Sequence, residues 1–245
     1  MNSFEDTAPL TLLTNLEASK LAENLRLLMA TTGEMKLTQI GAVSGSTFEV
    51  AYCGVTFLIS ISQENGNLSG LKEIFCSFDS LQIQSGVNIA LGAHVAGGER
   101  VPAIVRTFLD MAQKLGALCK AVATVWRPAA IVSGFEYFEQ AVSGYLTGGA
   151  FPVLAMVNFK SGTEGVITTN GLATLSGQEL QIECGTMDEA DMMQRVMRVA
   201  HDLAVNGPVN EHLSLDGMDV GEKLKLEPSS GAGLLKVTIE SVLDG

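Results

Sequence analysis

The stretch from residue 87 to residue 126 constrains the fold more than any other part of the sequence. VNIALGAHV is typical of a buried strand, and AVATVW of a second one. Between them, ERVPAIVRTFLDMAQKLG carries apolar residues at helical spacing: Val101, Ile104, Val105, Phe108, Ala112 and Leu115. Pro102 suits the first helical turn and Gly116 the C-terminal end. If the two strands are parallel neighbours, the unit is right-handed.

Further elements are predicted on both sides of this unit. Before it, TLLTNL is a strand, a helix carries Leu21 and Leu25, and MKLTQIGAV, STFEVAYC and VTFLISIS are strands. SGLKEIFCSFDSL is predicted to be a short helix. After it, two helices are expected to begin at capping boxes, one formed by Ser133 and Glu136 and the other by Thr186 and Glu189. FPVLAMVNF, GVITTN, QELQIEC, EKLKLEP and LLKVTIESVL are strands.

This order of elements predicts an α+β protein in which mixed β-sheets pack against about four main helices. No Pro-rich, Ser-rich or highly charged linker divides the chain, so we expect a single domain over residues 1–245. The two halves, about 1–128 and 129–245, have a similar element order in one compact unit. They show no residue-level repeat.

Composition excludes several classes of protein. Apolar residues make up 47% of the chain, but no apolar run approaches the ~20 residues that a membrane-spanning helix needs. MNSFEDTAPL lacks the positive charge of a signal peptide, which predicts a cytoplasmic protein. The net charge of −12 and the absence of a Lys/Arg stripe argue against nucleic-acid binding. The acidic balance is explained either by solubility or by a basic protein partner.

No motif predicts a catalytic residue, a cofactor or a metal site. The sequence lacks a dinucleotide-binding or Walker glycine pattern and a Gly-x-Ser-x-Gly elbow. Its three histidines are far apart, and no His-Glu-x-x-His occurs. DGMDVGE lacks the acidic alternation of a calcium loop and is predicted to be a turn. One enzymatic alternative stays open, a hydrolase in which folding brings His94 near a serine or an acid.

The stretch GVITTNGLATLSGQELQIECG permits two interpretations. As a binding loop, it would offer Thr168, Thr169, Asn170 and Glu179. As a structural element, it is a strand, a turn at Asn170-Gly171, one short helical turn and a second strand. Alternation along that second strand places Glu179 on the face opposite the core.

A second candidate site lies where two strands of the first unit end. If those strands are parallel, His94 and Trp126 lie at the same sheet edge, where ligands often bind. The helix beginning near Glu99 and the charge of Arg127 would favour a small anion, and Trp126 would offer a stacking face. The structural alternative is a core Trp126 beside a solvated Arg127.

Four separated segments, VATVWRP, FPVLAMVNF, ITTNGLATLSGQELQIE and LDGMDVGEKLKL, carry a family resemblance. Their order and spacing resemble the bacterial family known as domain of unknown function 4261, from about Val87 onward. More distantly, the chain is similar to suppressor-of-fused-like domains. These act through protein contacts, and some accompany bacterial toxin systems as immunity proteins. The matching residues are Val125, Trp126, Pro152, Thr169, Gly171, Leu172, Gly177, Glu179, Leu180, Asp216 and Gly217.

The resemblance implies no reaction. Together with the acidic charge and the missing catalytic motifs, it predicts a non-enzymatic protein-interaction module of regulatory or immunity type. The alternatives are a protein that binds a small molecule or anion, and a hydrolase using His94. The oligomeric state stays open.

Overall fold

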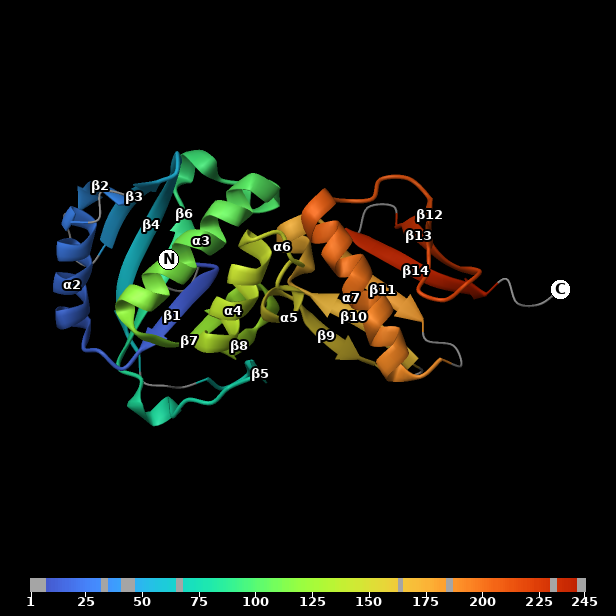
Figure 1. The fold of residues 1–245 in the computed structure, drawn as a ribbon, viewed down its shortest axis with the longest axis horizontal. Coiled ribbons are helices and arrows are strands. Elements are labelled where there is room, and N and C mark those ends of the chain that lie inside the picture. The colour runs from blue at the N-terminus through green and yellow to red at the C-terminus, as the bar shows by residue number, and fades with distance from the viewer. Residues whose placement is uncertain are drawn as a thin grey trace. The chain divides into compact units, whose positions relative to one another are not determined.

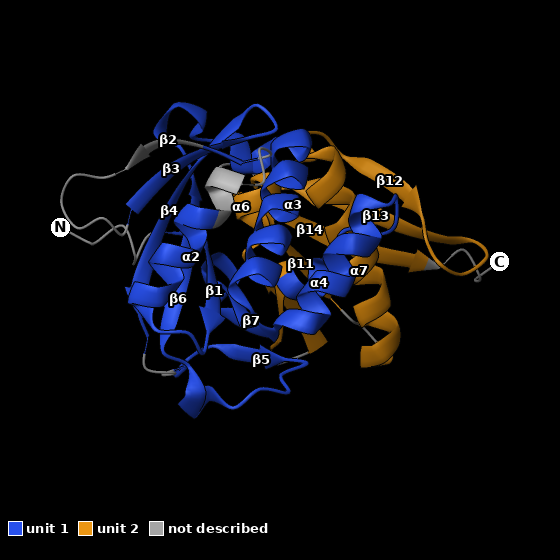
Figure 2. Ribbon diagram, turned by 60° about the vertical axis from the view of Figure 1, so that its left-hand side comes forward, with its two compact units in different colours: residues 1–155 blue, residues 156–245 orange. Residues whose placement is uncertain are grey.

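A computed structural model describes residues 8–31, 35–40, 47–64, 68–162, 165–183, 187–229 and 233–241. The chain divides into two compact units, Met1–Ala155 and Met156–Gly245 (Figure 2). Within the described ranges lie two mixed sheets and four helices of 12 residues or more, which confirms the predicted α+β class.

The sheet of the first unit runs in the order β2-β3-β4-β6-β1-β7-β8-β5. Every pairing between its described strands is antiparallel except that of β5 with β8. Its strands are β1 (Leu10–Thr14), β2 (Met35–Ile40), β3 (Thr47–Tyr52), β4 (Val55–Gln63), β5 (Lys72–Ile74), β6 (Ser85–Leu91), β7 (Ala121–Trp126) and β8 (Ile131–Gly134).

The strands β6 and β7 are parallel to each other but are not neighbours. Both pair antiparallel with β1, which lies between them, so Leu10 faces Ile89 on one side and Trp126 on the other. The condition that these strands be parallel neighbours is therefore met only in their direction. Its consequence still holds, because the C-terminal ends of β6 and β7 lie at the same edge of the sheet.

Three helices pack on this sheet, α2 (Ala18–Thr31), α3 (Pro102–Cys119) and α4 (Phe135–Leu146) (Figure 1). Helix α2 contacts β2 and β4, α3 contacts β1 and β7, and α4 contacts β7 and β8. A further apolar cluster includes Leu13, Val125 and Val132, and the segment between β4 and β6 packs Leu71 and Phe78 against it. Both faces of the central strands are thereby buried.

Two predictions about helix ends were wrong. Helix α3 does not stop at Gly116 but continues to Cys119, and Lys120 then ends it in the left-handed conformation (φ 51°). A Cβ on Gly116 would lie 2.0 Å from the Phe135 ring, so glycine here permits the close packing of α4. Ser133 does not cap α4, because it belongs to β8 and hydrogen-bonds Thr124 at 2.7 Å. The N-cap of α4 is Gly134.

Two segments have another secondary structure than predicted. SGLKEIFCSFDSL contains β5 and the start of a 3-10 turn at Ser80–Gln82 instead of a helix, because β5 satisfies its backbone groups by pairing with β8. FPVLAMVNF begins with the short helix α5 (Val153–Met156) and continues into β9 (Asn158–Ser161).

The sheet of the second unit runs in the order β12-β13-β14-β11-β10-β9, and only the pairing of β11 with β14 is parallel among its described strands. The remaining strands are β10 (Val166–Asn170), β11 (Glu179–Glu183), β12 (Leu213–Asp216), β13 (Glu222–Pro228) and β14 (Leu234–Ser241). Helix α7 (Glu189–Asn206) contacts β11 and the short helix α6 (Leu172–Ser176).

The start of α7 also differs from the prediction. Its N-cap is Asp188, whose side chain accepts from the Ala190 N–H, and Thr186 lies outside the described residues. The predicted pseudo-repeated halves and single domain stay predictions. The compact units divide at Ala155 instead of near residue 128, because β8 pairs with β7 and α4 contacts α3. In the described parts of the chain, no helix is long and apolar enough to cross a membrane.

Candidate functional site

His94 lies in a short 3-10 turn, Ala93–Val95, directly after β6, and its side chain is exposed. Among the described residues, no acid or nucleophile forms a hydrogen bond or ion pair with its imidazole. In a catalytic triad, the histidine is hydrogen-bonded to the nucleophile and to an orienting acid. The hydrolase alternative therefore has no supporting geometry in the described ranges.

Trp126 and Arg127 have different environments at the end of β7. The Trp126 ring is 4% exposed and packs edge-on against Phe108, with 6.3 Å between centroids, so it presents no open stacking face. Its Nε1 donor is buried and meets no acceptor in the part of the chain that the structure describes. Arg127 is exposed, and its guanidinium donates to the Thr11 hydroxyl at 3.2 Å.

That contact joins Arg127 to a polar row across the sheet, which the sequence analysis missed. The Thr11 hydroxyl donates to Asn88, whose amide donates to Ser62, whose hydroxyl donates to Glu64, at 2.7, 3.0 and 2.8 Å. Thr11 and Asn88 are completely buried. Each of these groups is satisfied by its neighbour, so the row stabilises the sheet and leaves no group directed at a ligand.

The stretch that contains Thr168, Thr169, Asn170 and Glu179 has a clear structural role. The Glu179 carboxylate accepts from the N–H groups of Gly171, Leu172 and Ala173 at 2.8–3.2 Å, which caps α6. The Thr169 hydroxyl donates to the same carboxylate at 2.7 Å.

The surrounding residues support the same structure. Gly171 has a φ of 94° at the turn, and the alternation along β11 is as predicted, with Leu180 and Ile182 buried. Thr168 and Asn170 are half-buried on β10, opposite Lys160 and Asn158. A binding role for these residues stays a prediction.

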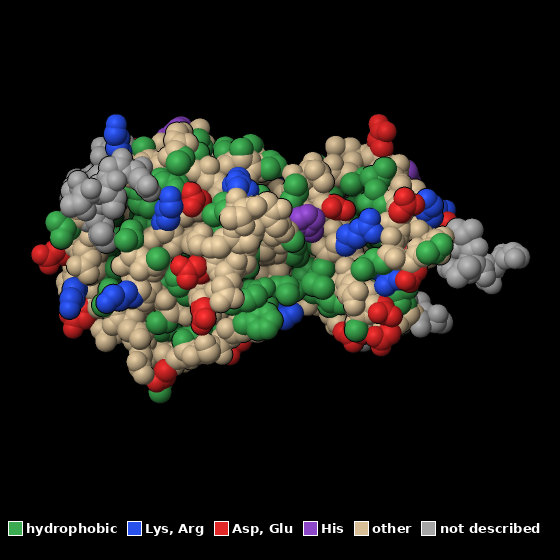
Figure 3. Space-filling model, viewed as in Figure 1, with side chains coloured by type: hydrophobic (Ala, Val, Ile, Leu, Met, Phe, Trp, Pro, Cys, Tyr) green, Lys and Arg blue, Asp and Glu red, His purple; other side chains and the backbone are tan. Residues whose placement is uncertain are grey.

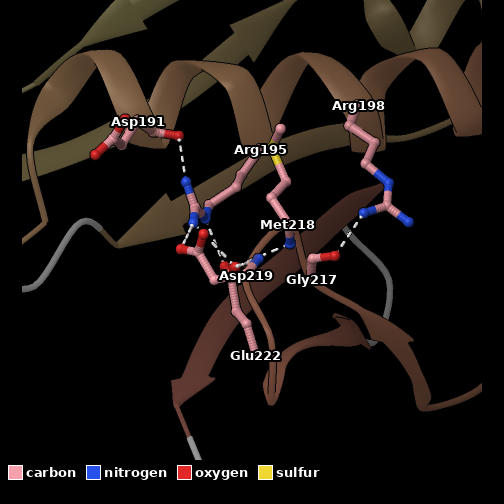
Figure 4. A network of polar contacts seen from close by, with 7 residues as sticks. All are labelled: Asp191, Arg195, Arg198, Gly217, Met218, Asp219 and Glu222. Atoms are coloured by element: carbon pink, nitrogen blue, oxygen red, sulfur yellow. Dashed lines mark hydrogen bonds and ion pairs between the residues drawn. The ribbon is translucent and has the colours of Figure 1, made fainter.

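The turn between β12 and β13 is held by a buried ion pair, shown in Figure 4. Arg195 of α7 donates from Nε and Nη2 to the two carboxylate oxygens of Glu222, at 2.5 and 2.9 Å. Both side chains are at most 5% exposed. Arg195 also reaches Asp219, which is exposed at 77%. The Met218 and Asp219 N–H groups donate to Glu222 as well, each at 2.9 Å.

These contacts fix the protonation state of the pair. Hydrogen bonding from Arg195 lowers the pKa of Glu222 from 4.5 to about 2, against the opposing effect of burial. A Cβ on Gly217 would lie 2.4 Å from the Glu222 side chain, so this position requires glycine. The arrangement anchors the turn and leaves Val220 at its tip 95% exposed.

A pocket of about 510 Å³ lies in the first unit, beside the edge strand β5. Its walls come from the residues after β5, the beginning of β7 and the first turns of α4. Pockets of this volume hold small ligands or side chains. Four aromatic residues and two acids contribute to the lining: Phe75, Phe78, Phe135, Tyr137, Glu136 and Glu139.

Phe75 is the most unusual residue of this pocket. It is 65% exposed, and its ring lies 4.5 Å from that of Tyr137, between centroids. Its φ of 47° is in the left-handed region, which bulky side chains rarely adopt. The Phe75 carbonyl oxygen would lie 2.5 Å from a Cβ on Gly134, so only a glycine there permits this backbone path. Next to it, the half-buried Cys76 thiol contacts the carbonyls of Ile74 and Val132.

Charged side chains are unevenly distributed on the visible face of each unit. On the face shown in Figure 3, acidic and basic side chains are interspersed over the first unit. In the second unit, acidic side chains gather where α7 begins, at Asp188, Glu189 and Asp191. The described residues contain no group of three His, Cys, Asp or Glu side chains that could hold a metal ion.

The chain matches no family model, no curated protein and no solved structure. Its resemblance to domain of unknown function 4261 stays a prediction. The pocket beside Phe75 is therefore judged by its own geometry and chemistry.

Proposed function

We propose that this chain is a non-enzymatic protein-interaction module, of regulatory or immunity type, and that it binds its partner through the pocket beside Phe75. The observation that carries this proposal is Phe75 itself, an exposed residue whose backbone is left-handed and whose ring lies tilted against that of Tyr137. Large aromatic side chains supply much of the binding energy at protein interfaces. A rigid ring beside a pocket is suited to that role.

The strained backbone supports the same proposal. A left-handed conformation costs an L-residue roughly 1–2 kcal/mol, and such strain is concentrated at functional sites. Here the ring gains little burial in return, because 65% of the residue stays exposed. Binding of a partner would bury it.

Other parts of the proposal come from the whole chain. A net charge of −12 disfavours a nucleic acid and favours a protein with a basic surface. The cytoplasmic location predicted from the sequence stays a prediction, as does the link to immunity proteins.

The test is affinity capture from an extract of the protein's own cells, quantified by mass spectrometry. We expect a stoichiometric partner with the wild-type chain and at least a tenfold smaller recovery with Phe75→Ala. Leu81→Ala is the matched control, because Leu81 is 89% exposed on the adjacent 3-10 turn but does not line the pocket. Equal recovery by the two variants, or no stoichiometric partner at all, would overturn the proposal.

A further inference from the structure

We propose that the pocket beside Phe75 recognises an arginine side chain in an extended segment of the partner protein. This inference rests on the proposed function and adds the chemistry of recognition. It starts from the two carboxylates of the pocket, Glu136 and Glu139, which lie three residues apart on α4. Residues at this spacing lie on the same face of a helix.

These carboxylates are not neutralised by the described part of the chain. Neither side chain forms an ion pair or a hydrogen bond with a described residue, and no Lys, Arg or His lines the pocket. The positive end of the α4 dipole carries only about half an elementary charge and is confined to the first turn. Two full negative charges outweigh it, so the pocket favours a cation.

The aromatic pair adds a second attraction for a cation. The rings of Phe75 and Tyr137 form a tilted pair at the pocket, and Phe75 keeps most of its surface open. A cation within about 6 Å of such a ring gains roughly 0.5–2 kcal/mol. Among the described residues, no cation of the chain itself lies over either ring.

The same unit already contains this combination of groups in an internal contact. Lys114 lies 5.1 Å from the centroid of the Tyr52 ring and 3.8 Å from the Asp110 carboxylate. Its ammonium donates to the Tyr52 hydroxyl at 2.6 Å. Cation, ring and carboxylate are therefore compatible within this fold. At the Phe75 pocket, the ring and the carboxylates are present, and the partner would supply the cation.

Two features favour arginine on a protein segment over a free amine. The planar guanidinium stacks on a ring while it donates to carboxylates, which an ammonium does less well. Strand β5 lies at the edge of its sheet, directly before Phe75, and only β8 pairs with it among the described strands. An extended segment can pair with such an edge and direct a side chain into the neighbouring pocket.

The experiment uses the full chain and three synthetic heptapeptides with central arginine, citrulline or glutamate between valine and glycine residues. Citrulline keeps the shape of arginine but not its charge. Binding is measured by NMR titration of the backbone amides. We expect the arginine peptide to shift the amides of residues 73–78 and 135–140 and to bind at least tenfold more tightly than the other two.

Charge variants complete the test. Glu136→Gln with Glu139→Gln is expected to reduce the arginine peptide to the affinity of the citrulline peptide. The matched control is Glu17→Gln with Glu183→Gln, which makes the same charge change at two exposed positions that do not line the pocket and is expected to bind as the wild type does. Equal binding of the arginine and citrulline peptides, or shifts elsewhere only, would overturn the inference.

The outcomes separate this inference from the proposed function. If partner capture depends on Phe75 but the arginine peptide shows no preference, the interaction module stands and the arginine pocket does not. If capture is also unchanged by Phe75→Ala, both are wrong.

Discussion

Phe75 and Val220 are both apolar residues that face solvent, 65% and 95% exposed. Different contacts hold the backbone in place at the two positions. The turn of the second unit is fastened by the buried pair of Arg195 and Glu222. Phe75 is held by a close approach to Gly134 and by its ring contact with Tyr137. Its backbone is strained, whereas Val220 has an ordinary negative φ.

The difference shows two ways in which a surface segment is fixed. A buried ion pair carries a desolvation cost, but it specifies one geometry because both charges must stay paired. A residue in the left-handed conformation has a strained backbone, and this conformation persists only where the surrounding contacts enforce it. The first arrangement fixes the turn, and the second fixes Phe75, the residue that we propose binds the partner. The two are therefore expected to respond differently to substitution.

The largest effect is expected for Arg195→Met, which leaves the Glu222 carboxylate buried without its cation. We expect a loss of about 3–5 kcal/mol in the free energy of unfolding, measured by urea denaturation. Arg198→Met is the control, because Arg198 is exposed on the same helix and donates only to the Gly217 carbonyl. Losses that are equal in the two variants would show that the buried pair does not anchor the turn.

Acid should weaken the same turn. The pKa of Glu222 is lowered from 4.5 to about 2 in the folded state, so its stabilisation is fully present above pH 4.5 and is lost as the pH falls towards 2. At about 1.4 kcal/mol per pKa unit, the loss is about 3 kcal/mol. The difference in unfolding free energy between wild type and Glu222→Gln should shrink over this range. A difference that does not change with pH would contradict the assignment.

A smaller effect is expected at Glu179, which caps a short helix. Glu179→Ala removes the acceptor of three backbone N–H groups and of the Thr169 hydroxyl. We expect a loss of about 1–3 kcal/mol, seen as a lower thermal unfolding midpoint. Glu183→Ala on the same strand is exposed and should change stability by less than about 0.5 kcal/mol. Similar midpoints for the two variants would exclude the capping role.

Local patterns predicted much of the fold. The apolar periodicity of α3, the strands β3 and β13, and the turn at Asn170-Gly171 follow from neighbouring residues, and the structure shows them. Gly116 was misinterpreted because its role is a contact with Phe135, a residue 19 positions later. No pattern within the α3 segment carries that information.

The candidate site shows the same limit. Leu71, Ile74, Phe75 and Phe78 have the i, i+3, i+4, i+7 spacing of a helix, yet pairing with β8 makes an edge strand there. The pocket forms only because this segment meets α4, far along the chain. The Arg195–Glu222 pair likewise could not be predicted, because no sequence pattern links two residues that are 27 positions apart. DGMDVGE was correctly predicted to be a turn, but the ion pair that holds the turn was not predicted.

The smallest expected effect is a difference in stability between glycine and alanine variants at Phe75 and at Val220. It distinguishes the two exposed segments most directly. At Phe75, both substitutions remove the ring contact with Tyr137, but only glycine relieves the left-handed backbone at φ 47°. We therefore expect Phe75→Gly to be more stable than Phe75→Ala by up to about 1 kcal/mol. At Val220, whose φ is negative, alanine should be the more stable by a similar amount, because glycine adds only entropy to the unfolded chain.

Paired urea denaturation curves of the four variants measure this reversal, and partner capture gives the functional counterpart. Phe75→Gly should fold at least as well as Phe75→Ala and still lose the partner, because the ring and not the backbone makes the contact. If alanine is the better residue at both positions, the left-handed conformation of Phe75 carries no strain, and strain does not mark the binding residue.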